Sequence, residues 1–269
     1  MDNYRNPIWT FVYNWYILNV SHLNSGYIIK WTIMKVLCFG DSITQGRPGV
    51  TYLKYLDGGY KNYGIGGDTL LSLSSRIKPY IESARYERFI IEVGANDILL
   101  PFLMSYSPVW SRVVERTISR GKTPCRDLRH FTEAYESLLL SLGKNKKSAC
   151  VVSIPCIGED TRSVLNKQAD SYNLVIKELC SELGFEYTDF NSWQKRVINS
   201  RKNDDIYFIS RNPFDVIFDS LLTTYLHLDT RLSKKRDLAV TVDGVHLNSV
   251  GAKGLAEMIK NAKVSAYGS

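Results

Sequence analysis

Short apolar stretches alternate with longer amphipathic ones along most of the chain. The short stretches predict five buried strands, at residues 35–39, 60–63, 87–93, 147–154 and 185–188. The longer stretches predict helices, at residues 50–56, 68–83, 131–142, 164–183 and 249–263. We expect Asp68 to cap the second of these helices. Strands separated by helices favour a parallel sheet with right-handed crossovers, and therefore an α/β fold.

The first predicted strand ends at Gly40, a residue that permits a tight turn, and Asp41 and Ser42 follow it. Ser42 is therefore expected at the rim of the sheet. If a helical turn begins there, its free backbone N–H groups face the surroundings of the Ser42 hydroxyl, where an oxyanion is stabilised during acyl transfer. Taken alone, the stretch is typical of a turn with a capping serine.

A carboxylate and an imidazole lie three residues apart in the later part of the chain, at Asp243 and His246. Within one turn of loop, this spacing lets the Asp243 carboxylate reach Nδ1 of His246 and leaves Nε2 for a nucleophile. Of the four histidines, only His246 has an acid so close and a helix-like segment after it. No G-x-S-x-G sequence occurs, so the nucleophile elbow of the α/β-hydrolases is not supported.

Two more polar segments follow predicted strands. Gly67 lies in a glycine-rich turn after the second strand, and Asn96 directly follows the third. Each offers a hydrogen-bond donor, the Gly67 backbone N–H and the Asn96 side-chain amide. Open α/β sheets collect their sites at the carboxyl ends of the strands, so we expect both donors at the same edge as Ser42.

These segments together resemble the sequence blocks of the SGNH, or GDSL, hydrolase family. Residues 40–44 resemble its first block and residues 94–97 its third, while Gly67 matches the glycine of the second and residues 243–246 resemble the fifth. The resemblance runs from about residue 34 to about residue 259. All four blocks occur in order, which is more specific than any single motif.

The resemblance implies a role for each site residue. Ser42 is the implied nucleophile, His246 the base and Asp243 the residue that orients the imidazole. The backbone N–H groups of Ser42 and Gly67 and the Asn96 amide form the implied oxyanion hole. The expected reaction is two-step acyl transfer: Ser42 attacks an ester carbonyl, and water then hydrolyses the acyl-enzyme.

The resemblance also implies a flavodoxin-like fold, a three-layer α/β/α sandwich around a parallel five-stranded sheet. The implied activity is hydrolysis of esters or thioesters without a metal or an organic cofactor. The family includes lipases, lysophospholipases, thioesterases and carbohydrate acetylesterases, so a lipid-like or small acyl ester and a carbohydrate O-acetyl ester both stay open as substrates. A non-catalytic binding protein on the same fold is a further alternative.

Composition suits a single α/β domain with extensions. The chain has 269 residues, of which 44% are hydrophobic and 23% charged, a balance that provides a real core. Its net charge of +7 and pI of about 9.0 suit a basic surface, with anionic lipid as a peripheral partner. No zinc finger or RNP-type motif occurs, so we expect no nucleic acid as partner.

The five cysteines are odd in number and contain no C-x-x-C pair. This pattern argues for reduced thiols and against both a disulfide framework and a zinc site. Together with the absence of a signal-peptide pattern at the start of the sequence, it leads us to expect a cytoplasmic protein that can also associate with a membrane surface.

Residues 1–33 precede the first predicted strand and do not share its pattern. Residues 8–20 are rich in aromatic and branched side chains but are interrupted by Asn14 and Asn19, and they are too few for a membrane span. Three interpretations stay open: a packed extension, an interfacial anchor, or translated upstream sequence with Met34 as the natural start. The last is favoured, because Met34 lies immediately before the first strand of the expected hydrolase domain, 34–269.

Two predicted helical insertions interrupt the domain, near residues 98–130 and 197–238. The first is rich in arginine and should overhang the site, and we favour a solvated helical face over a basic rim for an anionic headgroup. In the second, residues 212–228 place Phe, Ile, Leu and Tyr at helical steps on one stripe and Asp, Ser and Thr opposite. We favour packing of this stripe on the domain, with contact to acyl chains or a lipid surface as the sharper alternative.

Overall fold

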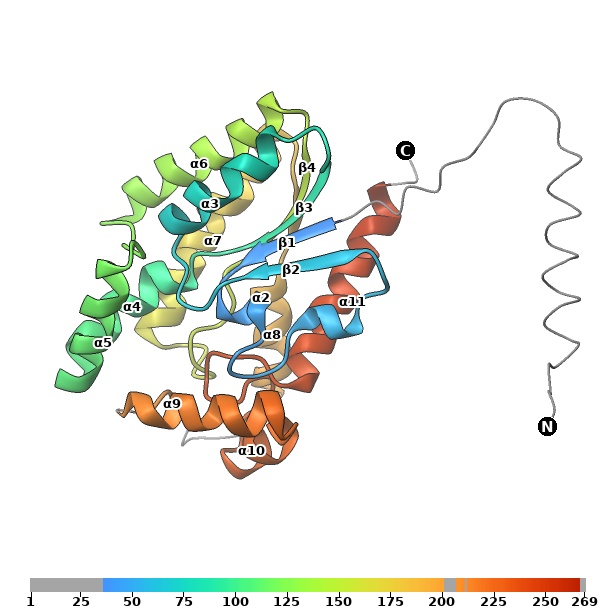
Figure 1. Cartoon of the computed structure of the whole chain (residues 1–269). Coiled ribbons are helices and arrows are strands. Elements are labelled where there is room, and N and C mark those ends of the chain that lie inside the picture. Colours follow the sequence, from blue (N-terminus) through green and yellow to red (C-terminus); the bar gives the residue numbers. More distant parts are fainter. Residues whose placement is uncertain (1–35, 201–206, 211, 267–269) are drawn as a thin grey trace, which may run out of the picture. The chain divides into compact units, whose positions relative to one another are not determined.

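The fold is built on a parallel sheet of five strands (Figure 1). The computed structural model describes residues 36–200, 207–210 and 212–266, so the expectations for residues 1–33 lie outside the described residues. The strand order is β2-β1-β3-β4-β5 and every neighbouring pair is parallel. The strands are β1 (Val36–Gly40), β2 (Tyr60–Gly64), β3 (Arg88–Glu92), β4 (Ser148–Val152) and β5 (Glu186–Thr188).

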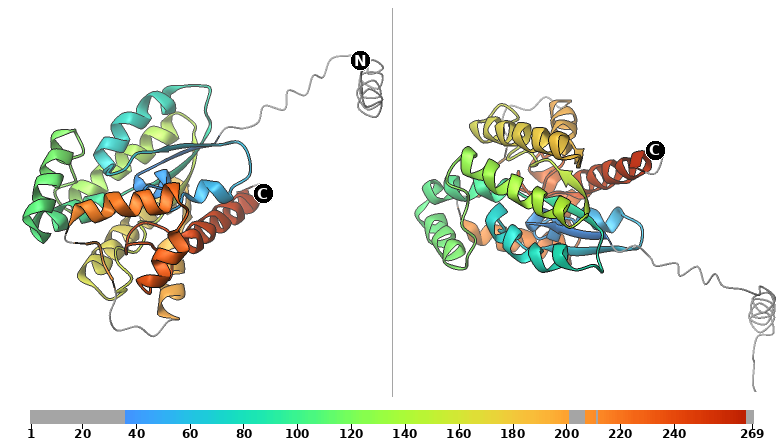
Figure 2. Two further views of the ribbon diagram at one scale, coloured as in Figure 1. Left: turned by 60° about the horizontal axis from the view of Figure 1, so that its bottom comes forward. Right: turned by 90° about the horizontal axis from the view of Figure 1, so that it is seen from above.

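Helices cover both faces of the sheet, because alternate side chains of each strand point to opposite faces. Leu37 and Phe39 of β1 join the core that includes α3 (Leu70–Glu82), α6 (Leu128–Lys144) and α7 (Val164–Leu183). Val36 and Cys38 join the core that includes α8 (Phe190–Asn199), α11 (Ser249–Ala266) and the 3₁₀ turn Tyr52–Tyr55. Figures 1 and 2 show these layers, which confirm the expected three-layer, flavodoxin-like α/β/α sandwich.

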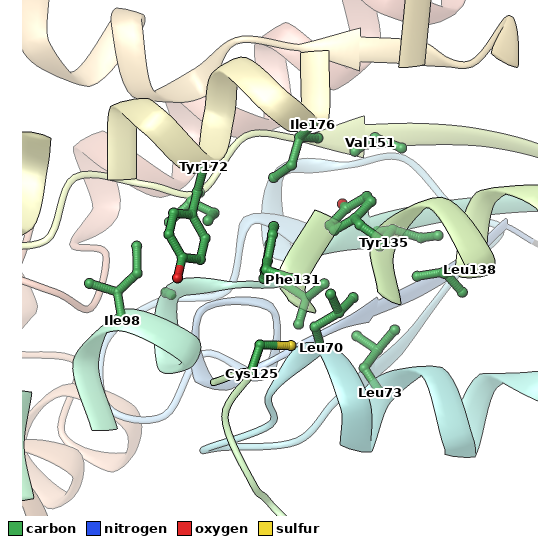
Figure 3. Packing of buried hydrophobic residues seen from close by; sticks show 14 of the residues in the cluster. Leu70, Leu73, Ile98, Cys125, Phe131, Tyr135, Leu138, Val151, Tyr172 and Ile176 are labelled. Carbon is green, nitrogen blue, oxygen red and sulfur yellow. The ribbon is translucent and has the colours of Figure 1, made fainter. Parts of the chain in front are cut away.

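Aromatic side chains fill the first core (Figure 3). Phe131 of α6 lies between Leu70 of α3 and Tyr172 of α7, and Tyr135 lies further along α6 on the side away from Tyr172. The ring centroids of Phe131 and Tyr172 are 4.5 Å apart. This contact ties α6 to α7 on one face of the sheet.

The N-terminal cap of α3 differs from the expectation. Thr69, not Asp68, is the cap: its hydroxyl accepts the backbone N–H of Ser72, whose own hydroxyl accepts the N–H of Thr69. Asp68 is buried and instead pairs with Arg76 and Lys122. Two cationic partners and a completed capping box at Thr69 leave Asp68 no capping role.

The first predicted insertion is helical, as expected, and its bounds and those of α8 are now defined. The first insertion forms α4 (Ala95–Tyr106) and α5 (Pro108–Ser119). The second insertion was expected to begin near residue 197. Helix α8 already begins at Phe190, because Asp189 caps it by accepting the N–H of Ser192 at 3.1 Å.

None of the helices in the described ranges is long and apolar enough to cross a membrane.

The second insertion folds as α9 (Pro213–Ser220), a π-helical turn at Leu221–Tyr225 and α10 (Asp229–Lys235). The helix is present, but the favoured packing of its apolar stripe on the domain is wrong. Phe214 and Ile217 are exposed, whereas Asp219 and Thr223 on the opposite side are buried. Asp219 is turned inward because it forms an ion pair with Arg236.

Candidate active site

Ser42 begins the one-turn helix α2 (Ser42–Gln45) directly beyond β1. Asp41 caps this helix, since its Oδ1 accepts the N–H of Ile43 at 2.8 Å. The turn requires Gly40: a Cβ at this position would lie 2.1 Å from Thr44 Oγ1 and 2.7 Å from the Glu92 carbonyl oxygen. The tight passage from strand to helix places Ser42, half-buried, at the carboxyl edge of the sheet.

His246 lies between Ser42 and Asp243. Its Nε2 is 3.0 Å from Ser42 Oγ, and its Nδ1 is 2.7 Å from Asp243 Oδ2. The other carboxylate oxygen of Asp243 accepts the backbone N–H groups of Val245 at 2.9 Å and of His246 at 2.8 Å. The structure therefore brings together the three residues that the sequence predicted, in hydrogen-bonded order.

Charge and burial set the pKa values of this pair. Burial favours a neutral imidazole, but the adjacent Asp243 carboxylate and its hydrogen bond outweigh that effect and raise the pKa of His246. Burial likewise opposes ionisation of Asp243, yet His246 and the backbone N–H groups hold the pKa of this carboxyl below its ordinary value. Asp243 thus stays ionised, and the imidazole is a stronger base than in water.

A buried carboxylate that the sequence analysis left without a role holds the segment before this loop. Oε1 of Glu159 accepts the backbone N–H groups of Val240 and Thr241, both at 2.9 Å, and the Thr241 hydroxyl at 2.6 Å. The Thr241 hydroxyl oxygen in turn accepts the N–H of Gly244 at 3.2 Å. Glu159 therefore helps to fix the loop that carries Asp243. In the sequence, Glu159 is recognisable only as an acid in the loop after the fourth strand. An acid at such a position is equally compatible with exposure to solvent, so the sequence does not identify this role.

The three expected oxyanion donors come from the ends of three adjacent strands. Ser42 follows β1, Gly67 lies in the turn after β2 with φ of +78°, and Asn96 is in the first turn of α4 after β3. All three line one cavity of about 310 Å³ together with His246. The Asn96 amide already donates two hydrogen bonds, to Asp41 Oδ2 at 3.0 Å and to the Asp68 carbonyl oxygen at 2.9 Å. These two bonds fix the position of the amide beside Ser42.

Residues 38–253 match the GDSL-like Lipase/Acylhydrolase family. The chain belongs to this family. Membership makes it an ester-hydrolysing enzyme and confirms the resemblance seen in the sequence. No curated protein sequence matches the chain.

Solved structures of esterases share the fold of this GDSL-family chain. An acetylxylan esterase of Geobacillus stearothermophilus is 19% identical, with a TM-score of 0.57 over 85% of this chain and 93% of that one. An alpha/beta hydrolase enzyme from the metagenome of Lake Arreo, Spain, is 14% identical, with a TM-score of 0.58 over 86% and 95%. The acetyl xylan esterase AlAXEase is 20% identical, with a TM-score of 0.53 over 85% and 98%.

The cavity of this GDSL-family enzyme has an apolar wall and a basic rim. Helices α4 and α5 supply most of the apolar wall. Their side chains in it are Leu99, Leu100, Leu103, Trp110, Val113 and Val114. Arg47, Arg120 and Lys122 also line the cavity. Lys122 pairs with the buried Asp68 and donates to the Gly66 carbonyl oxygen, so its charge is already engaged. Of the basic residues in the first insertion, Arg120 and Lys122 line the cavity.

A second buried acid, Glu92, lies at the end of β3 beneath α2. Its Oε2 accepts the Thr44 hydroxyl at 3.0 Å, and its Oε1 has no hydrogen-bond partner. Burial raises the pKa of Glu92 to about 7, and burial together with Glu92 raises that of Asp41. Asp41 serves the turn and its packing, since its carboxylate accepts the N–H of Ile43 and an N–H of the Asn96 amide. In the described part of the chain, no group of three or more His, Cys, Asp or Glu could hold a metal ion.

Proposed function

We propose that the chain is a serine esterase that cleaves carboxylic esters or thioesters through a triad of Ser42, His246 and Asp243. The observation that carries the proposal is the continuous contact from Asp243 Oδ2 through the imidazole to Ser42 Oγ, with separations of 2.7 and 3.0 Å. These distances suit proton transfer from the hydroxyl to the imidazole. A non-catalytic binding protein would gain nothing from this alignment.

In the proposed mechanism, Nε2 of His246 takes the proton of Ser42 as Oγ attacks the ester carbonyl carbon. The carbonyl oxygen becomes an oxyanion, which accepts hydrogen bonds from the backbone N–H groups of Ser42 and Gly67 and from the Asn96 amide, one of whose two N–H groups leaves Asp41 or Asp68 to make this bond. The imidazolium then protonates the leaving alcohol or thiol, and the acyl group stays on Ser42. A water molecule, deprotonated by His246, hydrolyses this acyl-enzyme and restores Ser42.

The substrate we propose is a lipid-like or small acyl ester. Its support is the apolar wall beside Ser42, where Leu103, Trp110 and Val113 can contact an acyl chain. A carbohydrate O-acetylesterase is the second candidate, favoured by the acetylxylan esterases among the structural neighbours. Rates on p-nitrophenyl acetate and octanoate separate the two: an acetylesterase cleaves only the shorter ester, and a lipid-type esterase cleaves both.

We further propose anionic lipid as a peripheral partner and the cytoplasm as the location. The supports are the net charge of +7 and the five buried cysteines, all in the described part of the chain, which form no disulfide. Thiols that form no disulfide are what a reducing compartment maintains.

Replacement of Ser42 by alanine tests the triad. Ser42→Ala is expected to abolish turnover of a p-nitrophenyl ester while the melting temperature stays near that of the wild type, because Ser42 is half-buried and removal of its hydroxyl leaves Asp41 in place as the cap. Ser141→Ala, on α6, is the matched control and should retain full turnover. Turnover by Ser42→Ala at the wild-type rate would exclude Ser42 as the nucleophile.

A further inference from the structure

The outward side of α9 and the following π turn forms an apolar surface, which we call the α9 face. Its members, with exposures of 48–67%, are Phe214, Ile217, Phe218, Leu221, Tyr225 and Leu226. They are six of the fourteen exposed large hydrophobic residues found among the described residues, and they include all three aromatic ones. Scattered apolar side chains are ordinary on a surface, but a contiguous group of this kind marks an interaction site.

The orientation of α9 is fixed by polar contacts on its inward side. Both carboxylate oxygens of Asp219 accept from Arg236, at 2.6 and 2.9 Å. The Thr223 hydroxyl accepts the N–H of Gly49 at 2.8 Å and donates to the Asp219 carbonyl oxygen at 2.7 Å. Rotation of the helix to bury its apolar stripe would break the bonds to Arg236 and Gly49 and remove the carboxylate partner of the half-buried Arg236. The α9 face is therefore presented outward by the fold itself.

The α9 face is continuous with the catalytic cavity. Phe218, Tyr225 and other members line a groove of about 610 Å³, and Pro48 and Val216 line both this groove and the cavity that contains Ser42. Arg47 lies at the same border, because it lines the cavity and its guanidinium carbon is 5.7 Å from the centroid of the Tyr225 ring. An acyl chain that leaves the α9 face thus meets the mouth of the catalytic cavity.

Basic side chains flank the α9 face. Helix α5 contacts α9, and α10 contacts the π turn, as Figures 1 and 2 also show. The exposed cations on these two helices, or directly after α5, are Arg112, Arg116, Arg120, Arg231, Lys234 and Lys235. Two exposed acids lie among them, Glu115 on α5 and Asp215 on α9, whose carboxylates accept the hydroxyls of Ser111 at 3.1 Å and Ser210 at 2.5 Å. An apolar surface flanked by cations complements a plane of anionic headgroups over hydrocarbon.

We propose that the α9 face seats the enzyme on an anionic lipid bilayer, and that the ester reaches Ser42 past Pro48 and Val216. A protein partner or a second copy on this face would cover the mouth of the cavity, whereas a bilayer supplies both the covering surface and the ester. The binding step stands independently of catalysis. The delivery of the ester to Ser42 rests on the esterase function proposed above.

Vesicle sedimentation with the full-length protein tests the binding step. The probes are phosphatidylcholine vesicles and vesicles of equal parts phosphatidylcholine and phosphatidylglycerol, and Ser42→Ala is included so that catalysis cannot alter the lipid. We expect both wild type and Ser42→Ala to bind the anionic vesicles. Phe214→Ser/Phe218→Ser should lose more than about tenfold in affinity, since two aromatic side chains no longer enter the bilayer. The matched control, Leu140→Ser/Leu174→Ser, removes two leucines that are equally exposed on α6 and α7 and should bind as the wild type does.

Three results would overturn the docking proposal: no wild-type binding to anionic vesicles, equal binding by both double variants, or a dimer in sedimentation velocity that only the α9-face variant disrupts. Melting temperatures of the two double variants establish that both are folded. Hydrolysis separates the two proposals. Vesicle binding without turnover of any soluble ester would contradict the esterase and leave the docking surface standing, whereas soluble turnover without vesicle binding would contradict the docking surface alone.

Discussion

At the scale of single residues, the site depends on side chains that are held before any substrate arrives. Asn96 is the clearest case, because Asp41 Oδ2 and the Asp68 carbonyl oxygen fix its amide through two hydrogen bonds. Both N–H groups of this amide are therefore occupied, and one of them has to exchange its acceptor for the oxyanion while the other bond keeps the amide oriented.

Asn96→Ala is expected to lower kcat by roughly 10²–10³-fold, the usual effect of the loss of one oxyanion donor. Steady-state kinetics on a p-nitrophenyl ester measure this, with Asn145→Ala at the C-terminal end of α6 as the control. A rise in KM with kcat unchanged would mean that Asn96 binds the substrate and lies outside the oxyanion hole.

Glu92 makes stability depend on pH. Burial raises its pKa from 4.5 to about 7, so the folded protein holds this proton more tightly than the unfolded chain does. The folded state is therefore more stable when Glu92 is protonated than when it is ionised. This contribution to the free energy of unfolding is complete below pH 4.5 and is lost as the pH rises through about 7. The shift corresponds to about 3 kcal/mol at most.

Glu92→Gln removes this titration and keeps an oxygen for the Thr44 hydroxyl. We expect the variant to melt at a higher temperature than the wild type above about pH 8 and at nearly the same temperature near pH 5. Thermal melts across this range measure the difference. A constant difference at every pH would show that the pKa of Glu92 is the same in the folded protein as in the unfolded chain.

At the level of secondary-structure elements, the sequence pattern predicted the parallel sheet and the succession of strands and helices along the chain. The ends of α7 coincide with the predicted 164–183. Ser42, Gly67, Asn96, Asp243 and His246 could also be found, because each follows a strand or precedes a helix in a short motif, and the fold brings them to one cavity or one hydrogen-bonded chain.

The parts that could not be predicted depend on tertiary partners. The period of α9 indicates a helix with an apolar stripe, but only the ion pair of Asp219 with Arg236 determines which side faces inward. Glu159 is similar, because its three backbone donors belong to residues 239–241, some eighty positions later in the chain. The pattern of neighbouring residues contains no information on contacts between distant parts of the chain.

The wall formed by α4 and α5 should set the preference for acyl length. Val113 lines the cavity, whereas Val109 on the same helix is similarly exposed and does not line it. Val113→Ser is expected to reduce kcat/KM for p-nitrophenyl octanoate about three- to tenfold and to leave the acetate nearly unaffected, since roughly one to two buried methylene contacts are lost. Val109→Ser is the control, and equal losses on octanoate for the two variants would exclude α5 as the acyl wall.

At the scale of the whole molecule, we propose that residues 34–269 form the catalytic domain. The sheet, both of its cores and the site described above are built from residues after Met34. A chain that begins at Met34 is therefore expected to fold and to hydrolyse esters at the rate of the full-length protein. Solubility, melting temperature and turnover measure this, and a large fall in melting temperature would assign residues 1–33 to the folded core.

The proposed catalysis depends on the activation of Ser42 by His246 and Asp243. Labelling of the full-length protein with a fluorophosphonate probe, followed by peptide mass spectrometry, measures this activation, because the probe reacts with an activated serine. We predict a single adduct on Ser42 that is absent from Ser42→Ala and strongly reduced in His246→Ala. No adduct on the folded wild type, or an adduct that persists unchanged in Ser42→Ala, would contradict the account.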